Sequence, residues 1–201
     1  MPQKDNTTLE LKVQLRLMML QRLSQPPVVI ETHGGLGAVY ERCYKSVTSG
    51  VVFEIDPDKA TILALQRPSW SVYEADCTSA LRAGVGAHLV ANVLDVDPYG
   101  DPWPTIAAFF HSERPRPPEM FVVVNDVLRN SVWAHEAWAT STLAPVVQEF
   151  GNDLYDHYLP VCRYLMENLS ERAGYNVAGF HGYYCGQHDR NTHYLAILRK
   201  G

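Results

Sequence analysis

The chain is poor in cysteine pairs, in basic residues and in long apolar runs. Its 201 residues include four cysteines, and no two of them form a CxxC pair. This spacing argues against a disulfide framework and indicates free thiols in a reducing compartment. Lys and Arg number 17 against 22 Asp and Glu, which gives a net charge of −5 and argues against a broad basic surface for duplex nucleic acid. No apolar run reaches the roughly 20 residues that cross a bilayer.

The N-terminal segment predicts a helix and no secretory signal. Residues 1–8 are polar and lack an apolar segment before a cleavage site, so we expect a cytoplasmic protein without membrane association. Apolar residues at helical spacing predict an amphipathic helix over residues 8–24, and Pro26-Pro27 ends it. Its apolar positions are Leu9, Val13, Leu17, Leu20 and Leu23, and Lys12, Arg16 and Arg22 lie between them. Core packing is favoured over a membrane-surface role. We expect residues 1–27 to form this helix and a linker, and residues 28–201 to form one domain.

From residue 28 onward, strand-like and helix-like segments alternate. The expected strands are 28–31, 51–56, 70–74, 88–96 and 120–124, and the expected helices are 38–48, 57–67, 78–83 and 105–110. Near-continuous apolar strands predict a parallel sheet that is covered on both faces. A long helix over 154–171 then precedes strands 175–184 and 193–198, which the loop 185–192 joins as a hairpin. The pattern predicts an α/β fold with a Rossmann-like, doubly wound, mostly parallel sheet and an antiparallel C-terminal hairpin strand.

The first of these strands runs into a glycine-rich turn, Glu31-Thr32-His33-Gly34-Gly35-Leu36-Gly37. A strand that breaks into such a turn before a helix is typical of a nucleotide or cofactor site. The dinucleotide fingerprint requires a small residue three positions after Gly37, but Tyr40 stands there. No Gly-Lys-Ser/Thr follows, so a P-loop is excluded as well.

This turn resembles the first motif of class I S-adenosylmethionine-dependent methyltransferases, an acid followed by G-x-G-x-G. Glu31, Gly35 and Gly37 match, and His33 stands where the first glycine is usual. The resemblance implies that the loop passes close to the methionine part of the cofactor. Histidine at this position either points away from the pocket or narrows it.

The resemblance also implies which acids bind the cofactor. Asp56 would take the two ribose hydroxyls, with Glu54 as the alternative acid, and Asp76 would accept a hydrogen bond from the adenine amino group. Pro57 and Cys77 would contact the faces of the adenine. Taken singly, each acid could instead be a solvated or helix-capping carboxylate. The predicted cofactor residues are Glu31, His33, Gly35, Gly37, Asp56, Pro57, Asp76, Cys77 and Asp95.

The fourth strand runs into Asp97-Pro98-Tyr99-Gly100. This segment resembles the D/N-P-P-Y/F motif of methyltransferases that act on exocyclic amino groups of bases, with one proline in place of two. It is closer to the motif of tRNA guanine N2-methyltransferases. Asp97 could accept hydrogens from the amino group, Pro98 would stiffen the turn, and Tyr99 or Trp103 would stack on the base. A simple tight turn is the alternative. Asp97, Pro98 and Tyr99 are the predicted catalytic residues.

Weaker signals surround these motifs. The loop 111–116 carries Arg114 and Arg116 and could touch a phosphate backbone or be a solvated linker. Asn125 and Asp126 end the fifth strand, where they could line an acceptor pocket, as could Arg129, Trp133, His135 and Trp138. The residues His181, Cys185, His188 and His193 lack a recognised zinc spacing, so no metal is expected.

Together these features predict a cytoplasmic S-adenosylmethionine-dependent N-methyltransferase that acts on a nucleic-acid base. A methyltransferase for a small molecule or a protein is the alternative. A catalytically silent member that binds the cofactor or a partner is a third reading. The sequence makes no prediction of the oligomeric state.

Overall fold

The structure is a computed structural model that describes residues 8–135, 138 and 141–201. Its centre is a seven-stranded sheet of order β3-β2-β1-β4-β5-β7-β6. The strands are β1 (Val29–Glu31), β2 (Gly50–Glu54), β3 (Ser71–Glu74), β4 (Val93–Val96), β5 (Glu119–Asp126), β6 (Tyr175–Cys185) and β7 (Asn191–Lys200). The first five strands pair in parallel, and β7 is antiparallel to both β5 and β6.

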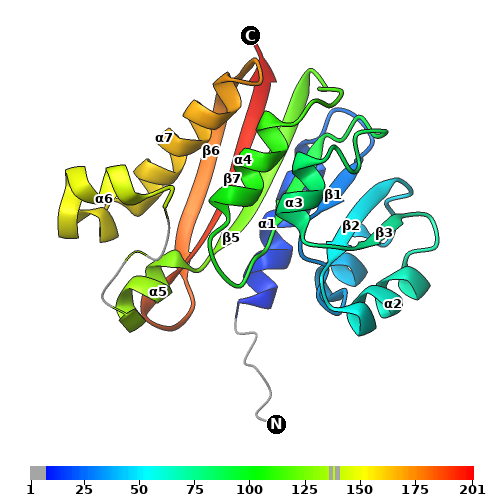
Figure 1. Ribbon diagram of the computed structural model, residues 1–201, viewed down its shortest axis with the longest axis horizontal. Helices are drawn as coiled ribbons and strands as arrows, with labels where there is room; N and C mark the ends of the chain where they lie inside the picture. The colour runs from blue at the N-terminus through cyan, green and yellow to red at the C-terminus, as the bar shows by residue number, and fades with distance from the viewer. Residues whose placement is uncertain (1–7, 136–137, 139–140) are drawn as a thin grey trace.

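Helices cover both faces of the sheet. The α-helices are α1 (Leu9–Arg22), α2 (Pro57–Gln66), α3 (Cys77–Arg82), α4 (Trp103–His111), α5 (Leu128–His135), α6 (Ala144–Phe150) and α7 (Tyr158–Glu171). The short helices are the π-helix η1 (Tyr40–Tyr44) and the 3-10 turns η2 (Gly151–Tyr155) and η3 (Gln187–Asp189). Figure 1 shows α3, α4 and α7 in front of the sheet and α1 behind it.

The core has two layers, one on each face of the sheet. Buried side chains of α3, α4 and α7 meet one face, where Ile30, Leu94 and Val122 point toward them. Side chains of α1 and η1 meet the other face, where Val93 and Val123 belong to the same apolar cluster. This alternation along each strand is the reason for the near-continuous apolar runs in the sequence.

The structure confirms the predicted fold class, including the antiparallel hairpin of β6 and β7. Boundaries differ at several elements. The second strand ends at Glu54 rather than at residue 56, because Asp56 already caps α2. The fourth strand begins at Val93 rather than at residue 88, and the predicted helix over 154–171 begins at Tyr158 after a 3-10 turn. Helices α5 and α6 were not predicted.

Helix α1 packs on the sheet as predicted, but with a different face. Val13, Leu15 and Met19 are buried, whereas Leu17, predicted on the apolar side, is 41% exposed. Arg16, predicted on the polar face, is fully buried. The reason is a counter-charge inside the sheet, because Arg16 pairs with Asp95 of β4.

No helix in the described part of the chain is both long and apolar enough to cross a membrane.

Candidate functional site

The glycine-rich turn follows β1 at the carboxyl edge of the sheet, where open α/β folds bind ligands. Gly35 and Gly37 have φ of +54° and +81°, a conformation that favours glycine. A side chain added at Gly35 would meet no atom within 4 Å, so the space beside the turn is open. The turn therefore offers backbone to a ligand.

Glu54 anchors this turn from the end of β2. Its carboxylate accepts hydrogen bonds from the backbone N–H of Gly35 at 2.8 Å and of Asp56 at 3.0 Å. Asp56 instead accepts from the N–H groups of Asp58 and Lys59 and pairs with the Lys59 side chain. The Lys59 contacts hold the pKa of Asp56 below its ordinary value. At the strand end beside the glycine turn, the structure therefore has Glu54, the alternative acid, whereas Asp56 caps α2, and its role toward the ribose stays a prediction.

Asp76 lies after β3 and is the N-cap of α3. Its Oδ1 accepts a hydrogen bond from the N–H of Ser79 at 2.8 Å. The Ser79 hydrogen bonds lower the pKa of Asp76. Cys77 follows and is buried, and burial raises the pKa of its thiol. Asp76 is thus an exposed carboxylate at the same edge of the sheet as Glu54.

His33 bridges the glycine turn and α3. Its Nδ1 lies 2.7 Å from Thr32 Oγ1, and its Nε2 lies 3.5 Å from Cys77 Sγ. The Thr32 hydroxyl donates its one proton to the carbonyl of Asp95, so Nδ1–H is the donor to Thr32 and Nε2 accepts from the thiol. Burial lowers the pKa of His33 even though carboxylates, Asp97 foremost, surround it. The imidazole is therefore neutral at pH 7.

Glu31 does not face the glycine turn. It is buried, and its carboxylate accepts a hydrogen bond from Arg67, whose guanidinium lies over the ring of Tyr40 at 4.2 Å. Burial raises the pKa of Glu31 to about 7, against the opposing pull of Arg67. In the structure Glu31 is thus paired inside the fold with Arg67, and its role as a cofactor residue stays a prediction.

Asp95 is likewise used inside the fold. Its two oxygens accept from Arg16 at 2.5 and 2.6 Å, and Tyr44 donates to it at 2.6 Å. Both partners of the ion pair are buried. As with Glu31, the structure pairs Asp95 inside the fold, and its role as a cofactor residue stays a prediction.

Asp97, two residues further along, lies at the rim. Lys12 Nζ donates to both of its oxygens, at 2.8 and 2.9 Å. The side chains are 18% exposed for Lys12 and 23% for Asp97. Burial tends to raise the pKa of Asp97, but Lys12 and Arg16 outweigh it and hold that pKa below its ordinary value. Asp97 is therefore an ionised carboxylate within reach of solvent.

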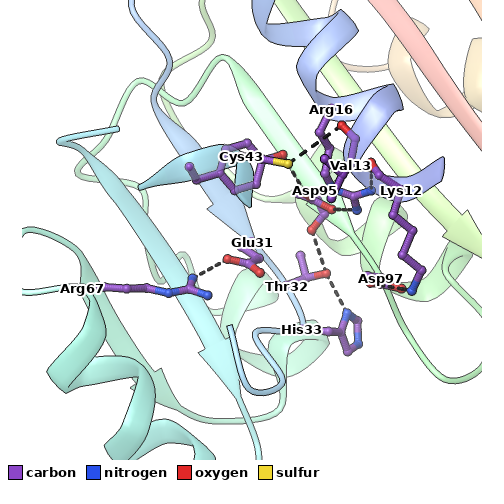
Figure 2. Close-up of polar contacts among 11 residues, drawn as sticks. Lys12, Val13, Arg16, Glu31, Thr32, His33, Cys43, Arg67, Asp95 and Asp97 are labelled. Atoms are coloured by element: carbon purple, nitrogen blue, oxygen red, sulfur yellow. Dashed lines mark hydrogen bonds and ion pairs between the residues drawn. The ribbon is translucent and has the colours of Figure 1, made fainter. Parts of the chain in front are cut away.

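The two ion pairs have matching spacing. Lys12 and Arg16 are four helical residues apart, about 6 Å along the axis of α1. Asp95 and Asp97 are two strand residues apart, about 6.6 Å along β4 and on one face. Figure 2 shows both cations leaving α1 toward β4, and Glu31 meeting Arg67 elsewhere. Sequence reasoning missed Lys12 and Arg16 as partners, although their spacing was visible.

The loop after Asp97 contains the other predicted catalytic residues. Pro98 is buried, and Tyr99 is 87% exposed. Trp103 is fully buried at the start of α4, so of the two aromatic residues Tyr99 is the one at the surface. Ile55, after β2, is 70% exposed at the same edge of the sheet. Apolar side chains are thus left uncovered beside the carboxylates.

Two weaker predictions have structural outcomes. Arg116 donates to the carbonyls of Phe109, Phe110 and Ser112 at the end of α4, and Arg114 donates to the carbonyl of Leu81. These arginines therefore serve the fold, not a phosphate backbone. Among the described residues, no group of three or more His, Cys, Asp and Glu side chains is arranged to hold a metal ion. His135 lies in α5, and its side chain lies outside the described part.

Comparisons with known proteins find similarity in structure only. No protein-family model and no curated protein sequence match the chain. Trm1 from Pyrococcus horikoshii, in complex with S-adenosyl-L-methionine, has a TM-score of 0.70 and 10% identity; the match covers 100% of this chain and 59% of Trm1. The N-methyltransferase NodS from Bradyrhizobium japonicum WM9, in complex with S-adenosyl-l-homocysteine, has a TM-score of 0.63 and 12% identity, with 98% and 89% covered. TYW2 from M. jannaschii, in complex with AdoMet, has a TM-score of 0.59 and 10% identity, with 98% and 78% covered.

These matches show that the chain has the fold of those cofactor-bound structures. The chain spans less than two thirds of Trm1. At such low identity a shared fold does not by itself carry the activity, so the function has to be argued from the site.

Proposed function

We propose that the chain is an S-adenosylmethionine-dependent methyltransferase whose acceptor is an exocyclic amino group of a nucleic-acid base. The observation that carries the proposal is the edge formed by the ends of β1, β2, β3 and β4. There the turn at Gly35 is joined to Glu54, and the exposed Asp76 and the partly exposed Asp97 follow the ends of β3 and β4. The shared fold with cofactor-bound structures supports the same assignment.

The residues at this edge suit the cofactor. Glu54 retains lone pairs that can accept from two ribose hydroxyls, because each carboxylate oxygen has more than one acceptor site. Asp76 can accept from the adenine amino group, and the exposed Ile55 offers an apolar contact. Gly35 leaves open space for the ligand. When bound, S-adenosylmethionine supplies an electrophilic methyl group on a sulfonium.

Three further predicted residues remain part of the proposal, in the supporting roles of the resemblance. Gly37 shapes the turn, and Pro57 and Cys77 lie beside the proposed adenine site. His33 is the departure from the usual glycine. Because its imidazole is neutral, it adds no positive charge against the sulfonium. The His33 ring contacts Thr32 and Cys77, and the ligand has to bind beside the ring in this position.

Asp97 is the proposed catalytic residue. The lone pair of an sp² amino group is delocalised into the ring, so the group is a poor nucleophile. A carboxylate that accepts its hydrogens localises the lone pair and takes up the proton released as the N–C bond forms. Lys12 keeps Asp97 ionised for this task. Pro98 fixes the turn, and the exposed ring of Tyr99 offers a stacking face for a base.

A second candidate is a silent protein that keeps the fold without transferring methyl groups. The observation that favours it is His33, whose side chain stands at the position of a glycine and is tied at both ring nitrogens. A methyltransferase with a small-molecule or protein acceptor is the other alternative. Neither changes the proposed cofactor residues.

The decisive experiment is transfer of a radiolabelled methyl group from S-adenosylmethionine into a cell extract that is then separated into RNA, DNA, protein and small molecules. We expect label in a nucleic-acid fraction, and at least about 100-fold slower labelling with Asp97→Asn. Label in the protein or small-molecule fraction would overturn the proposed acceptor. Absence of label from every fraction, together with retained cofactor binding, would favour the silent protein.

A further inference from the structure

Asn125 near the end of β5 is a buried amide without a hydrogen bond in the part of the chain that the structure describes. The residue is 1% exposed, and neither its Nδ2 nor its Oδ1 has a partner. Buried polar groups in native proteins are nearly always paired, because an unpaired one loses its bonds to water without replacement. An amide with both of its polar atoms unpaired therefore requires an explanation.

The strand registers place Asn125 beside the proposed catalytic acid. The parallel pairing of β4 and β5 ends at Val96 and Val124, so Asp97 and Asn125 are the next residues along. On its other side, Asn125 is paired with His193 of β7. All three belong to the sheet face that α1 covers, because Val123 and Leu195 lie in the apolar cluster of α1. Asp97, Asn125 and His193 thus form a row across three strands.

The charges along this row differ from residue to residue. Lys12 acts on both neighbours of Asn125. Its ammonium is bonded to Asp97, and its charge, together with burial and Arg16, lowers the pKa of His193 to about 3. His193 is therefore neutral, and its Nδ1 lies 3.3 Å from the hydroxyl of Tyr183. The amide of Asn125 faces Asp97 and helps to lower the pKa of that carboxyl, although no hydrogen bond of 3.5 Å or less joins the two side chains. The row thus consists of the Asp97 anion, the Asn125 amide with unused hydrogen-bonding capacity, and the neutral His193 ring.

We propose that Asn125 is an acceptor-binding residue, which hydrogen-bonds the edge of a nucleobase whose amino group reaches Asp97. The bases that carry an exocyclic amino group present a ring nitrogen next to it. This nitrogen is a donor in guanine and an acceptor in adenine and cytosine. A carboxamide can donate to the one and accept from the other. The inference rests on the proposed function and adds a residue to its acceptor site.

In this proposal a base reaches Asn125 past the Lys12–Asp97 pair. Both of these side chains are partly exposed, whereas the neighbouring Asn125 is buried. The Lys12 side chain has four flexible carbons, and its ammonium contacts the Asp97 carboxylate. When a base enters, the Lys12 ammonium moves aside and the amide of Asn125 gains the partner that it lacks.

The test begins with Asn125→Leu, which keeps the branched shape and the number of side-chain heavy atoms and removes both polar atoms. Because no hydrogen bond of 3.5 Å or less is lost in the described part of the chain, we expect the melting temperature to stay equal or rise. Methyl transfer should fall by about 10- to 100-fold, because a polar atom of the base edge is left without its partner. Binding of S-adenosylhomocysteine should stay unchanged.

The matched control is Asn92→Leu. Asn92 is also buried, but its amide donates to the carbonyl of Pro26 and accepts from the N–H of Val28. This variant should have a lower melting temperature. If Asn125→Leu also lowers the melting temperature, retains transfer or weakens S-adenosylhomocysteine binding, the inference is overturned.

A readout that does not depend on activity separates this inference from the proposed function. The side-chain amide resonances of Asn125, assigned in an NMR spectrum by their loss in Asn125→Leu, are followed as adenosine, cytidine or guanosine is added with S-adenosylhomocysteine present. At least one nucleoside should shift them and leave those of Asn92 in place. A shift without methyl transfer would retain the inference and reject the transferase. No shift with any nucleoside would overturn the inference.

Discussion

Asp95 and Asp97 lie two residues apart on one face of β4, and each receives a cation from α1, yet their surroundings differ. Asp95 is buried, and Arg16 and Tyr44 bind it with three hydrogen bonds. Asp97 is 23% exposed, and the flexible Lys12 donates to both of its oxygens. The aspartate at position 95 is thus paired inside the fold, whereas the aspartate two residues later, at the end of the strand, is accessible to a ligand.

Two glutamates on the neighbouring strands β1 and β2 differ in the same way. Glu31 at the end of β1 is buried with Arg67, whereas Glu54 at the end of β2 binds the backbone of the glycine turn. A buried ion pair adds little net stability, but the loss of one partner leaves an uncompensated charge. We call Glu31 and Asp95 the inner acids and Glu54 and Asp97 the outer acids. Substitution of an inner acid or its cation should therefore affect folding, and substitution of an outer acid should affect ligand binding or methyl transfer.

The largest expected effect is on folding, through Arg16→Met. This change leaves Asp95 buried without its cation, which should lower the free energy of unfolding by about 3–5 kcal/mol. Lys12→Met removes the partner of the more exposed Asp97 and should cost at most about 1 kcal/mol. Chemical denaturation of the two variants measures the difference. Equal losses of unfolding free energy in the two variants would show that burial does not distinguish the Arg16–Asp95 pair from the Lys12–Asp97 pair.

Asp97→Asn should act on transfer rather than on folding. Removal of the carboxylate that accepts the proton should lower the rate by about 10²- to 10⁴-fold. The affinity for S-adenosylhomocysteine should change little, because the proposed cofactor contacts lie on other strands. Steady-state transfer and calorimetry on the same preparation test both parts. A loss of cofactor binding would mean that Asp97 belongs to the cofactor site.

Glu54→Gln should weaken the binding of S-adenosylhomocysteine by about 10- to 100-fold, the range for hydrogen bonds to a charged group. Asp56→Asn should change it by less than about twofold, because asparagine replaces aspartate well at a helix N-cap. Calorimetric titration of the two variants compares them. The opposite order would restore Asp56 as the ribose-binding acid.

The smallest expected effect is a pH dependence of stability. Burial raises the pKa of Glu31 to about 7, while the carboxyl of an unfolded chain titrates near about 4.3. Between these values the folded chain holds the extra proton, so the free energy of unfolding should rise as the pH falls from 7 to about 4.5. Glu31→Gln should flatten this rise by about 1–3 kcal/mol.

Asp126 supplies a second contribution of the same sign, because burial also raises its pKa to about 7. A slope should therefore remain in Glu31→Gln. The outer Asp97 has the opposite sign, since its lowered pKa means that its contribution is lost at acid pH. Denaturation curves at several pH values distinguish the two. An unchanged slope in Glu31→Gln would show that Arg67 keeps Glu31 ionised throughout.

The fold could be predicted because its signals are local. Apolar runs alternate with helical spacing, and the turn at Gly35 and Gly37 requires glycine-like φ angles. The end of β2 was misjudged because Glu54 and Asp56 share one face, and only the helix cap at Asp56 shows where the strand stops.

The roles of the acids could not be predicted from the sequence, because they depend on partners far along the chain. Arg16 lies 79 residues from Asp95, and Arg67 lies 36 residues from Glu31. A motif identifies an acid at a strand end but not the cation that occupies it. Asn125 was visible at the end of its strand, whereas its lack of hydrogen bonds appears only in three dimensions.

The central claim is that the glycine turn, Glu54 and Asp76 bind S-adenosylmethionine despite His33. Calorimetric titration of S-adenosylhomocysteine into the wild type and into His33→Gly tests it most directly. We predict saturable binding at one site per chain in both proteins, with equal or higher affinity in His33→Gly. Binding in the variant but not in the wild type would contradict the claim and identify His33 as a block. No heat of binding and no thermal shift in either protein would reject the cofactor altogether.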